Sequence, residues 1–206
     1  MSAFTIPEEY LSELTPAAPK DTRTDAEILE SLSQYKPVTS EKNVWAYWHS
    51  GLSAMPGRCR RNVISWVRIC GPSWTFRVLD TVPGSANHAL KFAPKELLPE
   101  TFVKGTMDGP YTGPHSADFL RGALLVEHGG VSMDVGCILF RDLDRVCWDQ
   151  IVDETSPYRV VVPLMYGQSP ANHFVAARKG DPFITRWSVP FTNVLRNIAN
   201  AEALQA

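Results

Sequence analysis

The fold of this chain is decided by residues 43–79, NVWAYWHSGLSAMPGRCRRNVISWVRICGPSWTFRVL. Their first segment, 44–48, is rich in aromatic residues and predicts a strand. Apolar side chains at helical spacing then predict a helix that ends at Cys70, before a glycine and a proline. A second strand is expected at 74–79. A strand, a helix and a strand within about 35 residues are typical of a parallel sheet with a crossover helix, so we expect an α/β fold.

The rest of the chain indicates an open, mostly parallel sheet flanked by helices. Ser116 is expected to cap a helix over residues 117–128, which a double glycine ends before a strand at 131–134. Further strands are expected at 137–140, 159–164 and 173–177. Further helices are expected at 25–35, 95–98, 143–152 and after Asp181 and Pro182, the last one broken at Pro190.

Length and composition indicate a compact globular chain. Hydrophobic residues make up 44% of the 206 residues and charged residues 20%, which argues against extensive disorder. Residues 1–40 are rich in Pro, Thr, Ser and Glu and are expected to form a peripheral arm with one short helix. Residues 41–206 are expected to form the main domain.

Charge and cysteine usage exclude several classes of function. A net charge of -2 gives no general attraction for nucleic acid. The basic run Arg58, Arg60 and Arg61 is expected to lie on a solvated helix face. The cysteines form no C-x-x-C pair, which argues against a zinc or redox motif.

Targeting signals are absent from the sequence pattern. No stretch approaches the roughly 20 apolar residues of a membrane span, and the first residues do not resemble a secretory signal. We therefore expect no nucleic-acid partner and no membrane span. The default location is the cytoplasm, or a secretory compartment if an anchor is missing from this sequence.

Candidate functional residues concentrate in HSADFLRGALLVEHGGVSMD, residues 115–134. Asp118 and Arg121 lie one turn apart on the predicted helix, and Asp134 ends the strand that follows. Ligands of open α/β sheets bind outside the carboxyl ends of strands, where Asp134 is expected. The carboxylates can accept hydrogen bonds from sugar hydroxyls, and Arg121 can pair with phosphate. On spacing alone, the better explanation is an i,i+3 ion pair on an exposed helix.

The segment SADFLRGALLVEHGGVSMDVG resembles the S-D-x-x-R and G-G-x-x-x-D-x-D pattern of glycosyltransferases with a DXD motif. It is most similar to glycosyltransferase family 32, the capsular polysaccharide synthesis type, and more distantly to the large glucosylating toxins. The resemblance extends upstream to VWAYWHSG and downstream to NHFVAARKGDPFI. It implies a GT-A-like, Rossmann-like fold in which residues 41–206 form a nucleotide-sugar-binding domain, short at its C-terminus for this family.

The resemblance also implies roles for particular residues. Asp118 and Arg121 would contact the donor sugar, and Asp134 would be the first DXD carboxylate, a ligand of Mn²⁺ or Mg²⁺. Trp45 or Trp48 could stack on the base; the alternative is that both are core residues. The implied activity is transfer of a hexose, with retention, from a UDP- or GDP-linked donor to a glycan, lipid or protein hydroxyl. No catalytic residue is assigned.

Position 136 departs from the family pattern, because Gly136 replaces the second acid of the DXD motif. Asp134, water and other residues could still hold a cation, so the sequence leaves metal dependence open. A literal D-x-D occurs at 142–144, but its flanking arginines indicate a helix start with local ion pairs. Gly136 and the early C-terminus leave a second hypothesis open, a non-catalytic module that binds a nucleotide sugar or a glycan.

Overall fold

The computed structural model describes residues 7–8 and 18–188. Its centre is a five-stranded sheet in the order β2 (Thr75–Leu79), β1 (Asn43–Tyr47), β3 (Gly130–Met133), β7 (Phe174–Ala177) and β4 (Val160–Val161). β1 is parallel to β2 and β3, whereas β7 is antiparallel to β3 and β4. Four of these five strands therefore run in one direction. The predicted α/β class with a mostly parallel sheet is confirmed.

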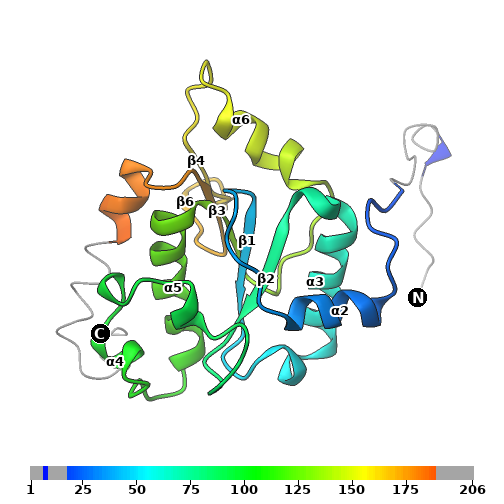
Figure 1. The fold of residues 1–206 in the computed structure, drawn as a ribbon. Helices are drawn as coiled ribbons and strands as arrows, with labels where there is room; N and C mark the ends of the chain where they lie inside the picture. The colour runs from blue at the N-terminus through cyan, green and yellow to red at the C-terminus, as the bar shows by residue number, and fades with distance from the viewer. Residues whose placement is uncertain (1–6, 9–17, 189–206) are drawn as a thin grey trace.

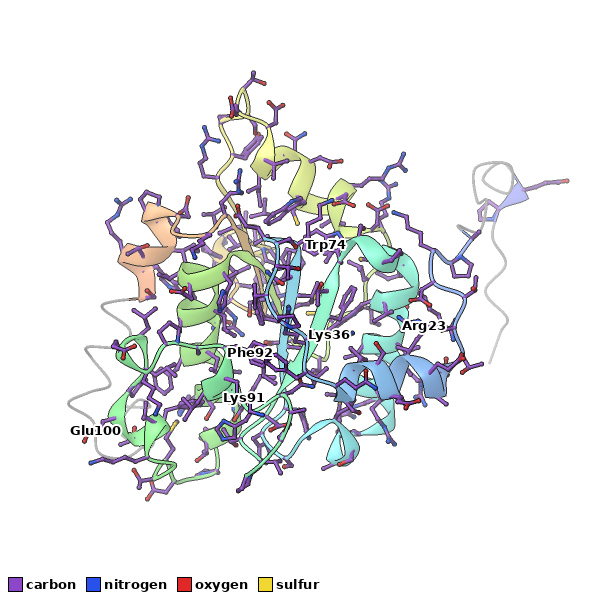
Figure 2. All side chains as sticks on the ribbon, in the orientation of Figure 1. Arg23, Lys36, Trp74, Lys91, Phe92 and Glu100 are labelled. Carbon is purple, nitrogen blue, oxygen red and sulfur yellow. The ribbon has the colours of Figure 1, made fainter. Side chains whose placement is uncertain are left out.

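Helices flank this sheet on both sides (Figure 1). They are α2 (Asp25–Ser33), α3 (Gly57–Cys70), α4 (Glu100–Val103), α5 (Thr112–His128) and α6 (Asp149–Val152), with a π-helical turn η5 (Asp144–Trp148) leading into α6. Helices α2 and α3 share one hydrophobic core with the sheet, and α5 shares the other. The labelled side chains of Trp74 and Phe92 in Figure 2 belong to the first and second core respectively.

Strand β1 contributes to both cores, because successive side chains of a strand point to opposite faces. Val44 and Ala46 belong to the core under α3, and Trp45 belongs to the core under α5. The aromatic run that predicted this strand is therefore buried on two sides. Burial on both faces explains why the hydrophobic residues of this segment are continuous rather than alternating with polar ones.

Most predicted elements are present, and three differ for identifiable reasons. The helix expected from residue 117 begins at Thr112, so Ser116 lies buried inside α5, where its hydroxyl contacts the Met107 sulfur instead of capping. Residues 137–140 form no strand and leave the sheet, with Phe140 87% exposed. The strand expected at 159–164 is divided between β4 and a separate hairpin of β5 (Leu164–Met165) with β6 (Ser169–Pro170).

The double glycine between α5 and β3 allows two backbones to approach each other closely. Gly129 and Gly130 have φ values of +68° and +106°, which side-chain-bearing residues rarely adopt. A Cβ on Gly130 would collide with the carbonyl oxygen of Asn43 at the start of β1. The Gly129 carbonyl also accepts a 2.9 Å hydrogen bond from the Trp45 indole. The two glycines thus set β3 against β1.

The segment before β1 is held on the sheet by Arg77, a buried residue of β2. Its guanidinium donates to the carbonyls of Lys36 and Pro37 at 3.1 and 2.8 Å and to the side-chain oxygen of Asn43 at 2.7 Å. These bonds compensate for removing the charge from water. Helix α2, expected within residues 1–40, is present, whereas the division of the chain at residue 40 stays a prediction.

The last helical segment described, residues 182–188, follows Asp181 as expected. The Asp181 carboxylate accepts from the N–H groups of Phe183 and Ile184, which is N-terminal capping. The predicted break at Pro190 lies outside the described residues. Within 7–8 and 18–188, no helix is both long enough and apolar enough to cross a membrane.

Substitution of Gly130 by alanine is expected to lower the free energy of unfolding by about 2 kcal/mol or more, because the new Cβ meets backbone at a positive φ. Gly136→Ala is the matched control, since a Cβ there meets no atom within 4 Å. Urea unfolding measures both. Equal stability of the wild type and Gly130→Ala would contradict the close approach of the two strands.

Candidate functional site

A cavity of about 730 Å³ opens at the carboxyl ends of β1 and β3. In the sheet, β2 lies on one side of β1 and β3 lies on the other. The chain reaches β2 from β1 through α3, and it reaches β3 later through α5. Such a change of direction between neighbouring parallel strands is where open α/β sheets bind ligands. All five residues predicted from the sequence border this cavity: Trp45, Trp48, Asp118, Arg121 and Asp134.

Asp118, Arg121 and Asp134 form one ion-paired cluster. Arg121 is 2% exposed and donates from Nη1 to Oδ1 of Asp118 at 2.5 Å and from Nη2 to Oδ1 of Asp134 at 2.8 Å. The predicted i,i+3 ion pair of Asp118 and Arg121 is therefore present, but Arg121 is buried and not on an exposed helix face, and the pairing extends to Asp134. A buried charge is tolerated only when it is paired and hydrogen-bonded. Arg121 thus fixes the two carboxylates relative to each other.

Asn172, just before β7, is a fourth member to which the sequence pattern assigned no role. Its side-chain nitrogen donates to Oδ1 of Asp118 at 3.0 Å, and it lines the same cavity. The neighbouring carbonyl of His173 accepts from the backbone N–H of Asp134 at 2.9 Å. The two contacts join the segment before β7 to both acids. The sequence signal for it was its place at the start of NHFVAARKGDPFI, the downstream segment of the family resemblance, to which no residue role was attached.

Asp134 begins a tight turn at the end of β3, in which the N–H of Cys137 donates to its carbonyl at 2.9 Å. Its side chain is 48% exposed. The surrounding protein raises the pKa of the Asp134 carboxyl above its ordinary value by desolvation, and the Arg121 charge opposes this shift. An acid with a raised pKa in a cavity is typical of a functional residue.

The two candidate tryptophans lie in different environments. Trp45 is 1% exposed, and its ring packs 6.0 Å from Phe92 and 5.4 Å from His128, with the Arg77 guanidinium 4.8 Å from its centre. The alternative of a core residue is thus the one observed for Trp45. Trp48 follows β1, is only half-buried and lines the cavity. Trp48 is therefore the tryptophan with side-chain surface that a ligand in the cavity could contact.

The turn after β3 contains half of the metal-binding pattern that the family resemblance implies. Asp134 is present, while Gly136 has open space where a side chain would project. In the part of the chain that the structure describes, no group of three or more His, Cys, Asp or Glu could hold a metal ion. One carboxylate suffices only where phosphates and water complete the coordination. In the turn after β3, Asp134 is therefore the one acid of this pattern.

The literal D-x-D at residues 142–144 does not line the cavity. Asp144 begins η5, pairs with Lys42 at 2.8 Å and accepts from the Trp74 indole at 3.3 Å. Asp142 pairs with Lys20 at 3.4 Å. The predicted helix start is confirmed, because the Asp142 carboxylate accepts from the Arg145 N–H and η5 follows. The ion pairs differ from the prediction, because the cationic partners are Lys20 and Lys42 from the segment before β1 and not the flanking arginines.

Arg58 is a cavity residue, although the sequence pattern predicts it on a solvated helix face. It lies in the first turn of α3 and is exposed, but the space it faces is the cavity. Helical periodicity separates apolar from polar faces and does not distinguish solvent from an open site. Arg60 and Arg61 are not among the lining residues.

The chain is related to fungal glycosyltransferases over most of its length. It is 58% identical to the probable glycosyltransferase FCK3 of Fusarium pseudograminearum, covering 93% of this chain and 48% of the relative. The identity is 42% to the O-glycosyltransferase braB of Annulohypoxylon truncatum, over 92% and 46% of the two chains. It is 48% to the glycosyltransferase afumC of Aspergillus fumigatus, over 80% and 44%. The chain thus spans about half the length of these relatives.

The fold is shared with a solved glycosyltransferase. The PaToxG glycosyltransferase superposes with a TM-score of 0.51 at 17% identity, covering 84% of this chain and 67% of the other. No family model matches the chain. The comparisons therefore connect both the sequence and the fold to proteins named glycosyltransferases, and the site's geometry is the basis for any finer assignment.

Asp134→Asn is expected to leave the free energy of unfolding unchanged, or to raise it slightly, at pH 7. The folded protein raises the pKa of this acid, so stability is highest while the acid is protonated and falls as pH rises through the folded-state pKa. Asparagine does not ionise, so the Asp134→Asn variant does not lose stability in this way as pH rises. Urea unfolding between pH 4 and pH 7 measures the difference, which should grow with pH.

Asp144→Asn is the control for this substitution, because it removes a partner of Lys42 and Trp74 away from the cavity. It should be no more stable than the wild type. A loss of more than about 1 kcal/mol in Asp134→Asn, beyond the usual value of a partly exposed ion pair, would show that Asp134 is mainly a structural residue.

Proposed function

We propose that this chain forms the donor-binding part of a glycosyltransferase that moves a hexose from a nucleotide-diphosphate sugar to a hydroxyl group. The observation that carries the proposal is the buried Arg121 holding Asp118 and Asp134 at the cavity between β1 and β3. Two fixed carboxylates beside an arginine suit a ligand with many hydroxyls and a phosphate. The fungal relatives named glycosyltransferases support the same class.

The donor sugar is assigned to the Asp118 side of the cluster. Arg121 and Asn172 both donate to Oδ1 of Asp118, which leaves Oδ2 as an acceptor for sugar hydroxyls. Each terminal nitrogen of Arg121 carries two N–H groups and makes one bond to a carboxylate. The cluster can therefore accept from a sugar and donate to it without losing its own geometry.

The nucleotide is assigned to the Trp48 side of the cavity. Trp48 is half-buried, which leaves surface on which a base can stack. Asp134, between the two sides, would accept from ribose or sugar hydroxyls. Where Mn²⁺ or Mg²⁺ binds, Asp134 would be its ligand in the turn after β3, with phosphate oxygens and water completing the coordination. UDP- and GDP-linked sugars both fit this chemistry.

In the proposed reaction, the bond between the anomeric carbon and the diphosphate oxygen breaks, and its electron pair leaves with the nucleoside diphosphate. A bond from the acceptor oxygen to the anomeric carbon forms, and the acceptor's hydroxyl proton passes to the leaving diphosphate or to water. The chain's own residues hold the donor and limit its orientation, which is a large part of catalysis by positioning. Two relatives are named O-glycosyltransferases, which favours a hydroxyl acceptor on a glycan, a lipid or a protein. Retention at the anomeric carbon is part of the proposal.

One observation favours a second candidate, a module that binds a nucleotide sugar without transferring it. Gly136 offers no second carboxylate, although the space around it would accept one. Such a module would bind the donor in the same cavity, with the same contacts to Asp118 and Arg121. Turnover separates the two candidates, because only the enzyme releases a nucleoside diphosphate.

The test of function is release of nucleoside diphosphate from UDP-glucose, UDP-galactose or GDP-mannose, with simple hydroxyl acceptors and with water alone. Asp118→Asn should reduce the rate by about a hundredfold or more if the carboxylate binds the sugar in the transition state. Asp144→Asn should retain the wild-type rate. Donor binding without release by any variant would support the second candidate, and equal rates in wild type and Asp118→Asn would contradict the site.

The two tryptophans provide a separate test of the base position. Trp48→Leu should weaken nucleoside diphosphate binding by about tenfold, the value of one stacking contact, with little change in thermal midpoint. Trp45→Leu should instead lower the thermal midpoint, because it removes a core residue and the indole bond to Gly129. Calorimetric titration and thermal unfolding measure both variants. The reverse pattern would place the base against Trp45.

A further inference from the structure

The charges that line the cavity pose a problem for a diphosphate. Arg121 is shared between Asp118 and Asp134, so these three side chains together carry one negative charge. A nucleotide-diphosphate sugar carries about two more. With only one DXD carboxylate and Arg121 on its Oδ1, the protein has a weak hold on a cation that would relieve this repulsion. A fixed positive charge is needed elsewhere in the cavity.

Arg58 has the position and the freedom to provide that charge. It lines the cavity, is exposed and makes no ion pair with any carboxylate of the described residues. It lies in the first turn of α3, a 14-residue helix that has neither a capping side chain nor an acidic residue in that turn. The N–H groups of Cys59 and Arg60 donate to the Pro56 carbonyl, which leaves those of Gly57 and Arg58 to favour an anion.

Helix α3 is fixed directly to the turn that carries Asp134. The side-chain amide of Asn62 donates to the carbonyl of Val135 at 3.0 Å, and the Trp66 indole donates to the carbonyl of Cys137 at 3.0 Å. Arg58 and Asp134 therefore stand on two elements that are bonded together on one side of the cavity. A phosphate near Asp134 and Gly136 would lie beside the start of α3.

A second, independent observation concerns Arg121, which lines the same cavity at 2% exposure. Its Nε has no hydrogen-bond partner in the part of the chain described. The two carboxylates thus do not satisfy all its donors. An unsatisfied donor on a buried cation is uncommon, so the hydrogen bonding of this cluster is incomplete without a further acceptor.

We propose that Arg58, with the open amides of the first turn of α3, binds the diphosphate of the donor. This arginine stands in for the charge compensation that a cation on a complete D-x-D would give. The inference rests on the proposed donor site. It makes binding of a nucleoside diphosphate largely independent of divalent cations, and it makes Gly136 compatible with a working donor site.

The test is calorimetric titration of the purified chain with UDP and with GDP, in EDTA and in Mn²⁺. For whichever of UDP and GDP binds, the wild-type dissociation constant should be similar in EDTA and in Mn²⁺. Arg58→Gln should weaken it about tenfold or more in EDTA, as expected for loss of a charge-assisted phosphate contact. Arg60→Gln is the matched control and should bind as the wild type does. Thermal midpoints of all variants check that they are folded.

Gly136→Asp tests the same inference in the opposite direction. The space at this position accepts a side chain, and a restored second carboxylate should make Mn²⁺ strengthen binding by about tenfold or more. Wild-type binding that is lost in EDTA, or Arg58→Gln binding equal to that of the wild type, would overturn the role of Arg58 and leave the donor site standing. No binding of either nucleotide in either buffer would overturn the donor site and this inference with it.

Discussion

The site depends on one buried guanidinium. Arg121 extends from α5 into the cavity and bonds to an acid of its own helix and to the acid that ends β3. A guanidinium that is 2% exposed needs compensating negative charge. Asp118 and the partly exposed Asp134 supply that charge from α5 and from the end of β3, so the cluster forms only while these two elements keep a fixed relation. That relation is set in turn by Gly129 and Gly130, where a Cβ would collide with the backbone of Lys179 and of Asn43 respectively.

The same constraint connects the fold to its chemistry. The crossover from β1 through α3 to β2, and the later one through α5 to β3, leave the ends of β1 and β3 uncovered. Helix α3 then brings Arg58 to this opening, and α5 brings Asp118. The acidic cluster alone would repel a diphosphate, and the start of α3 offsets this. A sugar can thus lie against the carboxylates while its phosphates lie against positive groups.

Much of this could be predicted from the sequence, because the decisive patterns are local. Aromatic and apolar spacing located β1, α3 and β2, and the double glycine marked the end of α5 and the start of β3. The Asp118, Arg121 and Asp134 assignment rested on a resemblance, and the structure brings all three residues into one cluster. The short apolar run at 137–140 misled the strand prediction, since a turn at Asp134 takes it out of the sheet.

What local patterns could not predict depends on contacts between distant segments. Asn172 becomes important only because its amide reaches Asp118, 54 residues away. In the sequence, Arg58 has the pattern of a solvated charge, and only the cavity next to it in the folded chain distinguishes it. Trp45 and Trp48 are three residues apart, and burial alone separates a core residue from a candidate stacking surface. In each case the missing information was the position of a second element.

The proposed ligand of this cavity is a nucleotide-diphosphate sugar. The most direct measurement is the thermal midpoint of the purified chain with increasing UDP-glucose, UDP-galactose or GDP-mannose, in wild type and in Arg121→Gln. A donor at about 100 times its dissociation constant should stabilise the wild type by ~2.7 kcal/mol. We predict a rise in midpoint with at least one donor in the wild type and none in a folded Arg121→Gln variant. No rise with any donor, or the same rise in both proteins, would contradict the account.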